Sequence, residues 1–267
     1  MKIGFIGGGN MAYAIAGGVV KAGLCGAGDI YVSDPIEAAH GKFQDLGIST
    51  DTNNMYALSG DIIILAIKPF IYPTALKALA ENAKEELKDK VFVSIAAGIS
   101  VKEIKGYLGF DAKVIRVMPN TPAMVLAGMS VLAEPISPVN DEEFTAACKI
   151  FEAVGEVEVL PEKLMNSVIA VSGSSPAYVY MLIEAMADGA VRDGIARDKA
   201  YRLAAQSVLG SAKMVLETGK HPGELKDMVC SPRGTTIAAV AELENAGYRN
   251  AILEAMRACT EKANHIK

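Results

Sequence analysis

The 267-residue sequence predicts an α/β protein in which a doubly wound, mostly parallel sheet is followed by an all-α region. Two observations predict this arrangement. Short apolar runs alternate with helical patterns as far as Leu160, which is typical of parallel strands joined by crossover helices. Beyond Pro161 the apolar residues recur only at the helical spacing of 3.6 residues. We therefore expect two domains, 1–160 and 161–267.

Each predicted strand of the first domain is a short apolar run bounded by turn residues. The run that follows Gly60-Asp61 is unbroken, as expected of a strand buried on both faces. In chain order the predicted strands are Lys2–Ile6, Asp29–Ser33, Ile62–Ala66, Val91–Ile95, Val114–Met118, Met129–Leu132 and Val157–Leu160. The helices predicted between them are Asn10–Ala22, Ile71–Leu87 and Asp141–Val154.

The second domain is predicted to be entirely helical, with helices at Pro176–Ile195, Asp198–Glu217, Thr235–Asn245 and Tyr248–Asn264. Asp198 is a good N-cap, and Gly194 and Gly219 are good stop signals. The helices carry Ala, Met, Ile and Leu on more than one face. Because a helical block this apolar commonly packs against a second copy of itself, we expect it to form a homodimer interface.

Composition and charge narrow the classes of partner. The net charge is −5 and the Lys and Arg residues are scattered, which argues against nucleic acid. The four cysteines lie far apart, so we expect reduced thiols in a cytoplasmic protein and no metal site. Strand-like residues start at Lys2, so no signal peptide is expected. No apolar run approaches the ~20 residues of a membrane-spanning helix.

A glycine-rich turn, Gly7-Gly8-Gly9-Asn10-Met11-Ala12, follows the first predicted strand and opens the first helix. It fits the pattern Gly-x-Gly-x-x-Gly/Ala. Gly7 permits a tight turn, Gly9 lets the backbone approach a pyrophosphate, and Ala12 is small enough for the helix to pack on the sheet. At a strand-to-helix junction this pattern predicts a Rossmann-type dinucleotide site, with the pyrophosphate at the helix N-terminus.

The second predicted strand ends at Ser33-Asp34-Pro35, where a carboxylate usually meets the adenosine ribose. Asp34 there accepts hydrogen bonds from the ribose hydroxyls and repels a 2′-phosphate, which favours NADH. Lys42 is the only nearby basic residue that could pair with such a phosphate. The alternative is that Asp34-Pro35 is simply a turn.

Three later turns follow predicted strands at the same edge of the sheet, where a doubly wound sheet binds its ligands. They are Ala66-Ile67-Lys68-Pro69, Ala96-Ala97-Gly98 and Met118-Pro119-Asn120-Thr121-Pro122. Each turn taken singly is compatible with simple chain reversal. Together they indicate a cleft.

The segment Ser231-Pro232-Arg233-Gly234-Thr235-Thr236 precedes an apolar helix late in the chain. It offers hydroxyl groups and free backbone N–H groups at a helix N-terminus, an arrangement that suits a small carboxylate. The alternative is an ordinary Ser/Thr helix cap after a proline turn.

With these residues in view, the whole chain resembles the pyrroline-5-carboxylate reductase family. The resemblance rests on the motifs at 4–11, 66–69 and 116–122, on Ser-Gly-Ser-Ser-Pro-Ala-Tyr at 172–178, and on the segment from His221 to Val229 that leads into Ser231–Thr236. The last two of these motifs, at 172–178 and 221–236, are specific to that family. The pattern Gly-x-Gly-x-x-Ala is shared with many dehydrogenases.

The resemblance implies a Rossmann domain and a helical domain that interleaves with a second subunit, in dimers that often assemble into decamers. It implies reduction of L-1-pyrroline-5-carboxylate to L-proline by NADH or NADPH, the last step of proline biosynthesis. The implied substrate-binding residues are Met228, Val229, Ser231, Gly234, Thr235 and Thr236, and Thr236, near the imine nitrogen, is the predicted catalytic residue. The predicted cofactor-binding residues are Ile6, Gly7, Gly8, Gly9, Asn10, Met11, Ser33, Asp34, Asn54, Ala66, Ile67, Lys68, Pro69, Ala97, Gly98 and Asn120.

The sequence departs from the family pattern at a few positions. Ser175 and Arg233 stand where the family usually has glycine, and Asp34 is unusual in a family that often prefers NADPH. Two other functions stay open. Lys163-x-x-Asn166 resembles the catalytic pair of β-hydroxyacid dehydrogenases, and an NAD-binding regulatory module without turnover would share the glycine-rich turn.

Overall fold

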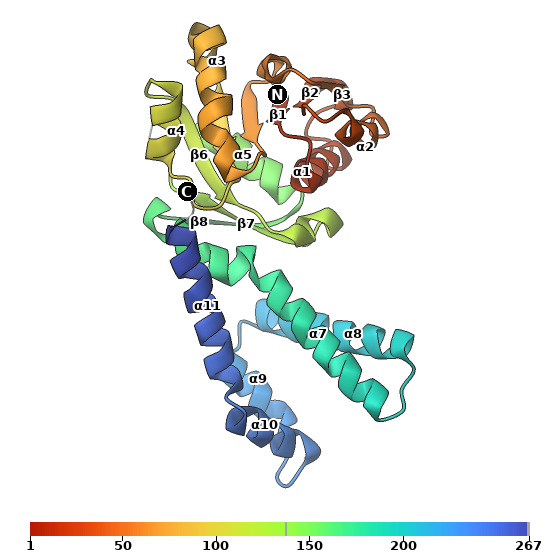
Figure 1. Ribbon diagram of the computed structural model, residues 1–267. Helices are drawn as coiled ribbons and strands as arrows, with labels where there is room; N and C mark the ends of the chain where they lie inside the picture. Colours follow the sequence, from red (N-terminus) through yellow and green to blue (C-terminus); the bar gives the residue numbers. More distant parts are fainter. Residues whose placement is uncertain (137, 266–267) are drawn as a thin grey trace. The chain divides into compact units, whose positions relative to one another are not determined.

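The computed structural model describes residues 1–136 and 138–265 (Figure 1). The chain divides into two compact units. The first is Met1–Ser174 together with the end of the chain from Cys259, and the second is Ser175–Ala258. By packing, therefore, residues 161–174 go with the sheet, although we predicted them at the start of the helical domain.

The first unit is built on one sheet, which has eight strands in the part of the chain that the structure describes, in the order β3-β2-β1-β4-β5-β6-β7-β8. All neighbouring strands are parallel except β6 and β7. The strands are β1 (Ile3–Ile6), β2 (Ile30–Ser33), β3 (Ser49–Asp51), β4 (Ile62–Leu65), β5 (Val91–Ser94), β6 (Lys113–Met118), β7 (Gly128–Ala133) and β8 (Gly155–Leu160). The predicted doubly wound, mostly parallel sheet is confirmed.

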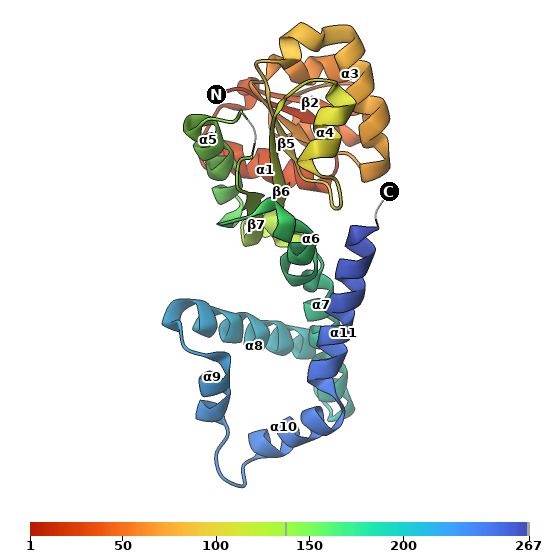
Figure 2. The ribbon, with the colours of Figure 1, turned by 90° about the vertical axis from the view of Figure 1, so that its left-hand side faces the viewer.

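Helices cover both faces of this sheet, and Figure 2 shows α3 and α4 on one side with α1 and α5 on the other. The helices of the unit are α1 (Asn10–Lys21), α2 (Gly41–Gln44), α3 (Tyr72–Leu87), α4 (Val101–Leu108), α5 (Asp141–Glu152) and α6 (Met165–Val168). Because both faces are covered, the central strands are apolar along their whole length: every residue of β1 and of β4 is buried.

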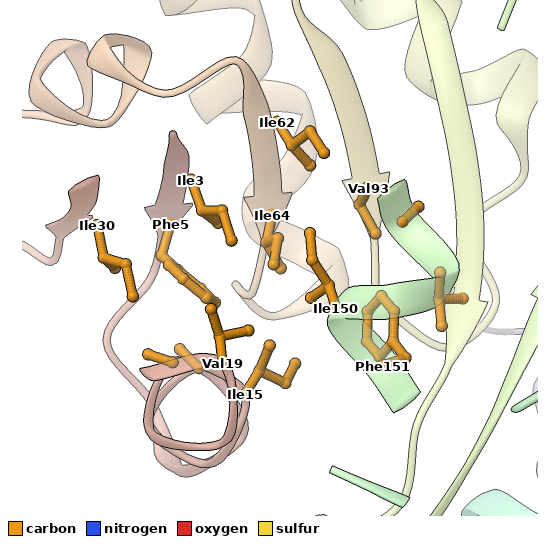
Figure 3. Packing of buried hydrophobic residues seen from close by; sticks show 14 of the residues in the cluster. Ile3, Phe5, Ile15, Val19, Ile30, Ile62, Ile64, Val93, Ile150 and Phe151 are labelled. Carbon is orange, nitrogen blue, oxygen red and sulfur yellow. The ribbon is translucent and has the colours of Figure 1, made fainter. Parts of the chain in front are cut away.

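One core lies between the sheet and α1 and α5. Side chains of β1, β4 and β5, such as Phe5, Ile64 and Val93, point toward Ile15 of α1 and Phe151 of α5 (Figure 3). The opposite face holds a second core, in which Phe92 packs with residues of α3 and α4. The sheet is thus fixed between two apolar layers, and its carboxyl edge stays open for the loops that follow the strands.

A third cluster joins the last strands to α6 and to the final turns of α11 (Tyr248–Asn264). Its centre includes Met118, Met165 and Ala263. Beside it, Arg116 of β6 donates from Nη2 to Asn166 Oδ1 (2.6 Å), and Asn166 Nδ2 donates to Asn264 Oδ1 (2.9 Å). These two hydrogen bonds hold the end of the chain to the sheet unit.

The second unit consists of helices only, as predicted. Its helices are α7 (Ser175–Arg192), α8 (Arg197–Thr218), α9 (Pro222–Val229), α10 (Thr235–Asn245) and the part of α11 before Cys259. Gly219 ends α8 in the left-handed conformation, in agreement with the sequence. Asp198 is not the N-cap, which is Ala196; Asp198 instead lies in the first turn, where a carboxylate still favours the helix dipole.

Among the described residues, five strands and helices were not predicted: β3, the short helices α2 and α6, α4 and α9. Strand β3 is a three-residue edge strand of polar residues, so it carries no apolar signal. Helix α4 is short, but its capping box, in which Ser100 and Glu103 bond each other's backbone N–H groups, is a local sequence signal that we did not use. Helix α9 falls in a segment that we treated as a motif alone.

One helical stretch, Glu162–Arg192, is long and apolar enough to cross a membrane when judged only by length and composition. A single stretch of this kind is weak evidence, because helices of water-soluble proteins pass the same test. Our sequence analysis considered only unbroken apolar runs, and charged residues interrupt this stretch, so it was not identified there.

The packing of β1 against the 3-10 segment η3 (Asn54–Ser59) gives a first prediction. A methyl group on Gly4 would overlap the carbonyl oxygen of Ala57 and lie 2.8 Å from its carbon. Gly4→Ala should therefore lower the free energy of unfolding by more than about 2 kcal/mol. Gly106→Ala is the matched control, because Gly106 lies inside α4 with open space around it. The control should raise stability by about 0.5–1 kcal/mol. Urea unfolding followed by circular dichroism measures both, and equal midpoints would refute the packing argument.

Candidate active site

The turn between β1 and α1 is held against the ends of two neighbouring strands. Gly7 has a φ of +102°, and its N–H donates to the carbonyl of Ser33 at the end of β2 (2.7 Å). A Cβ on Gly7 would lie 2.6 Å from the carbonyl oxygen of Ala66, just after β4. Glycine is therefore required at this position by backbone conformation and by close approach.

Gly9 is different, because a Cβ there would have no protein atom within 4 Å. It is the N-cap of α1 with extended backbone angles, and no side chain caps the helix. The first N–H groups of α1 therefore face open space at the positive end of the helix dipole. This is a cradle for an anionic group that needs close access to the backbone, as a pyrophosphate does.

A cleft of about 700 Å³ opens at this turn. Its size is within the range of small-molecule sites. It lies at the carboxyl ends of the strands on either side of β1, where the strand order reverses and doubly wound folds bind their ligands. The lining residues are Gly7, Gly9, Asn10, Met11, Asp34, Pro35, Ile36, Asn54, Ala66, Ile67, Lys68, Pro69, Ile71, Ile95, Ala96, Ala97 and Pro119.

The structure brings most of the predicted cofactor-binding residues together in this cleft, but not all. Of the residues outside the lining, Ile6 is buried in the core and Gly8 and Gly98 belong to the turns behind the wall. Ser33 is fully buried, and its Oγ lies 3.1 Å from the carbonyl oxygen of Phe5 and 3.0 Å from Asn54 Oδ1. Its hydroxyl is therefore bonded within the protein and does not face the cleft.

Asn120 is also engaged within the protein. Its Nδ2 donates to the carbonyl of Ser172 (3.1 Å), and its Oδ1 accepts from the N–H of Met129 (2.9 Å). The side chain is buried, so both ends of its amide are used to fix the loop that carries Pro119 at the cleft wall. In this structure Asn120 supports the cleft and does not line it.

Six lining residues are absent from the predicted cofactor-binding set: Pro35, Ile36, Ile71, Ile95, Ala96 and Pro119. Ala96 and Pro119 stand in turns that we predicted to form the cleft, and Pro35 directly follows Asp34, so sequence reasoning missed only Ile36, Ile71 and Ile95 entirely. The signal that would have found them is position alone, since every residue in the first turn after a parallel strand is a candidate for the cleft wall.

Tyr72 supports the wall from behind. It is completely buried, and its hydroxyl donates to the carbonyl of Leu65 (2.9 Å) and lies 3.0 Å from Ser94 Oγ. Burial raises the pKa of Tyr72 well above its ordinary value, so the phenol stays neutral. The ends of β4 and β5 are thereby tied together under Ala66 and Ile95.

The predicted substrate-binding residues lie in the second unit, at the end of α9 and the start of α10. Met228 and Val229 are exposed. The N–H of Gly234 donates to the carbonyl of Ser231 (3.0 Å), which closes a tight turn. A Cβ on Gly234 would overlap Ser231 Oγ, so a larger residue there requires the Ser231 side chain to rotate away.

This turn does not cap α10 with a hydroxyl group. The N-cap is Gly234, and no side chain caps the helix. The alternative that Ser231–Thr236 is an ordinary Ser/Thr cap is therefore not what the structure shows. Arg233, where the family usually has glycine, has a φ of +58°, a left-handed conformation that costs a residue with a side chain about 1 kcal/mol.

The residues of the β-hydroxyacid dehydrogenase alternative are placed differently from what that chemistry needs. Lys163 is exposed in a 3-10 turn, η6 (Glu162–Leu164). Asn166 has both ends of its amide bonded, to Arg116 and to Asn264. Neither residue lines the cleft. Among the described residues, no group of three or more His, Cys, Asp or Glu could hold a metal ion.

Two family models match the chain. Residues 162–266 match the family model for pyrroline-5-carboxylate reductase dimerisation, and residues 2–98 match a model described as NADP oxidoreductase coenzyme F420-dependent. The chain is 49% identical over 270 residues to the pyrroline-5-carboxylate reductase of Escherichia coli K12, covering 99% of this chain and 98% of that protein. This chain belongs to the pyrroline-5-carboxylate reductase family.

Other members are similarly close over their full length. The reductase of Methanosarcina acetivorans is 44% identical over 268 residues, covering 99% of this chain and 97% of that protein. Among solved structures, the Coxiella burnetii reductase gives a TM-score of 0.88 at 33% identity, covering 99% of this chain and 97% of that one. The Plasmodium falciparum reductase, solved with NADP bound, gives 0.89 at 30% identity with the same coverage. The predicted family and fold are confirmed.

The open space at Gly9 yields a second prediction. Gly9→Val places a branched side chain where the pyrophosphate would approach, so dinucleotide binding should weaken at least about a hundredfold. The backbone angles of Gly9 suit any residue, and loss of a glycine N-cap costs only about 1 kcal/mol. Calorimetric titration with NADH and NADPH, alongside urea unfolding, checks this. Tight binding by a folded variant would remove Gly9 from the pyrophosphate site.

Proposed function

We propose that this chain reduces L-1-pyrroline-5-carboxylate to L-proline with NADH or NADPH, the last step of proline biosynthesis. Membership of the family and the dinucleotide-type cleft support an NAD(P)H-dependent oxidoreductase. The observation that carries the substrate assignment is the Ser231–Gly234 turn, which leaves the first N–H groups of α10 without a side-chain cap. A substrate carboxylate can accept those N–H groups.

The chemistry needs few side chains. Bound NAD(P)H would supply the hydride, and the residues of this chain would bind and orient the two reactants. A cyclic imine can enter already protonated, and its carbon is then electrophilic without a protein acid. The contribution of the protein is to hold the ring in place and exclude water.

The positions of the three histidines agree with a site that uses few catalytic side chains. His40 is buried, and its Nε2 lies 2.8 Å from the carbonyl oxygen of Asp34, which can only accept, so Nε2 carries a proton. His221 is the N-cap of α9 and accepts the N–H of Gly223 at Nδ1 (3.0 Å). Neither lines the cleft, and His265 follows α11. We assign no histidine to proton transfer.

Within the carboxylate turn, Thr236 is the proposed catalytic residue. It stands in the first turn of α10, and its side chain is part-buried, whereas Thr235 is exposed. From there its hydroxyl can donate to, or orient, the imine nitrogen while neighbouring N–H groups hold the carboxylate. Met228 and Val229 supply apolar surface for the ring.

Thr236→Ala therefore tests the proposal. Loss of one hydrogen bond to a charged group should lower kcat about 10- to 100-fold. Dinucleotide affinity should not change, because Thr236 does not line the cleft. Thr236→Ser, which keeps the hydroxyl, is the matched control. Oxidation of NADH or NADPH by pyrroline-5-carboxylate, followed by absorbance, gives the rates. A fall in dinucleotide affinity equal to the fall in turnover would show that Thr236 has another role.

We further propose that the helical unit forms a homodimer, which can assemble into larger species. The family model for its region describes dimerisation. In the single chain it exposes many large apolar side chains, including Leu216 at 81% and Met181 at 69%. Solvent exposure of this much apolar surface is unusual for a monomer.

The four free cysteines also support the cytoplasm as the place of action.

Sedimentation equilibrium checks the assembly. The chain has a mass of 28.1 kDa, so we expect a species of at least twice that mass at micromolar concentration. Leu216→Glu should lower the association constant by at least about tenfold, because it places a charge on the apolar surface. A monomer for the wild-type protein would contradict the proposed dimer.

A further inference from the structure

We infer that this chain selects NADH over NADPH, and that Asp34 makes the choice. The inference rests on the proposed function, since it assumes that a nicotinamide dinucleotide occupies the cleft. It goes beyond the family, because the Plasmodium falciparum relative was solved with NADP bound.

The carboxylate of Asp34 is fixed at the cleft wall. Its Oδ2 accepts the N–H of Gly8 (2.7 Å), and its Oδ1 accepts the N–H of Ile36 (2.9 Å). These two bonds hold both oxygens in place, so the side chain cannot easily rotate away from a ligand. Because Gly8 belongs to the turn that would receive the pyrophosphate, the carboxylate lies beside the position of the adjoining adenosine ribose.

A fixed carboxylate at this position distinguishes the two dinucleotides. Each carboxylate oxygen keeps a free lone pair that can accept a ribose hydroxyl. NADH offers hydroxyl donors at both the 2′ and the 3′ positions. NADPH offers a dianionic phosphate at the 2′ position, and like charges this close repel strongly in a partly buried site.

The surrounding residues offer little compensation for that repulsion. Pro35 and Ile36, which follow Asp34 on the cleft wall, are apolar, and Glu37 adds a second carboxylate. No Lys or Arg stands between Asp34 and Lys42 in the sequence. In the described part of the chain, no ion pair joins Asp34 to a basic residue.

Three polar or basic groups close to Asp34 in the sequence are already engaged. The hydroxyl of Ser33 is buried between Phe5 and Asn54. His40 donates from Nε2 to the carbonyl of Asp34. Lys42 lies over the rings of Tyr13 and Phe43, with its Nζ 5.7 and 5.4 Å from their centroids. A 2′-phosphate could reach the Ser33 hydroxyl or His40 Nε2 only by breaking one of these hydrogen bonds.

Binding to the purified full-length protein tests the inference without relying on turnover. The chain has no tryptophan, so fluorescence of the reduced nicotinamide can be followed without energy transfer from the protein's indoles. We expect the wild-type Kd for NADH to be at least about tenfold lower than for NADPH. Competition by 5′-AMP and by adenosine 2′,5′-bisphosphate, which differ only in the 2′-phosphate, isolates the ribose, and 5′-AMP should compete better.

Asp34→Ser removes the charge and should shift the ratio of the two Kd values at least tenfold toward NADPH. Asp34→Asn is the near-isosteric variant: it removes the charge and, because its Nδ2 cannot accept, one of the two backbone hydrogen bonds, and it should shift the ratio in the same direction. Ile36→Arg retains Asp34 and its bonds but adds a cation beside it, and should also favour NADPH. This last variant keeps the test decisive if loss of the bond to Gly8 disturbs folding.

The outcomes distinguish a failure of the NADH selection by Asp34 from a failure of the proposed reductase function. Wild-type protein that binds NADPH as tightly as NADH, or more tightly, overturns the choice by Asp34 and leaves the reductase proposal intact. An unchanged ratio in folded Asp34→Ser and Asp34→Asn also overturns it. Wild-type protein that binds neither dinucleotide overturns the proposed function and this inference together.

Discussion

The close contact between the β1–α1 turn and the ends of β2 and β4 determines the cofactor end of the molecule. Gly7 bonds the last residue of β2 and approaches the backbone after β4 so closely that no side chain fits. Gly8 then binds the carboxylate of Asp34. With these contacts made, Gly9 and the first N–H groups of α1 are left facing the cleft. We propose that this one backbone conformation sets the pyrophosphate cradle and the ribose wall as well as the direction of α1.

The sheet supplies the rigid frame for that turn. Strands β1 and β4 are buried on both faces, between a layer of α1 and α5 and a layer of α3 and α4. Arg116 adds a polar tie inside this frame. Burial lowers the pKa of its guanidinium, and the charges of Glu162 and Glu103 oppose that effect, so it stays cationic. Its bond to Asn166, and the onward bond to Asn264, return the end of the chain to the sheet unit. The first of these bonds is partly buried and the second is exposed, so the network is anchored from inside the sheet unit by Arg116, which is itself buried.

The layout of the fold could be predicted because its signals are local. Apolar runs, glycine at a strand-to-helix junction and the 3.6-residue period after Pro161 each act over a few residues. The misses have physical reasons. Strand β3 is held by pairing with β2, and its own residues are polar. Ser33 and Asn120 carry polar groups at strand ends, but whether such a group faces the cleft or the interior depends on neighbours far away in the chain, such as Asn54 and Ser172. The segment after Leu160 is helical by sequence and joins the sheet unit through Met165 and Val168, a tertiary contact that periodicity does not encode.

The two reactants place different demands on a binding site, and we propose that each unit meets one of them. A dinucleotide is large and anionic, so it requires a preformed cleft with a helix N-terminus, and the sheet unit provides both. A small imino acid requires one carboxylate site, one group near nitrogen and apolar surface, and the α9–α10 connection offers these within nine residues, Met228–Thr236. An alkoxide product would need a proton donor, and among the side chains that line the cleft only Lys68 could serve, because the other ionisable group is Asp34. Reduction of an already protonated imine needs no such donor. The proposed C=N reduction therefore asks less of this site than C=O reduction would.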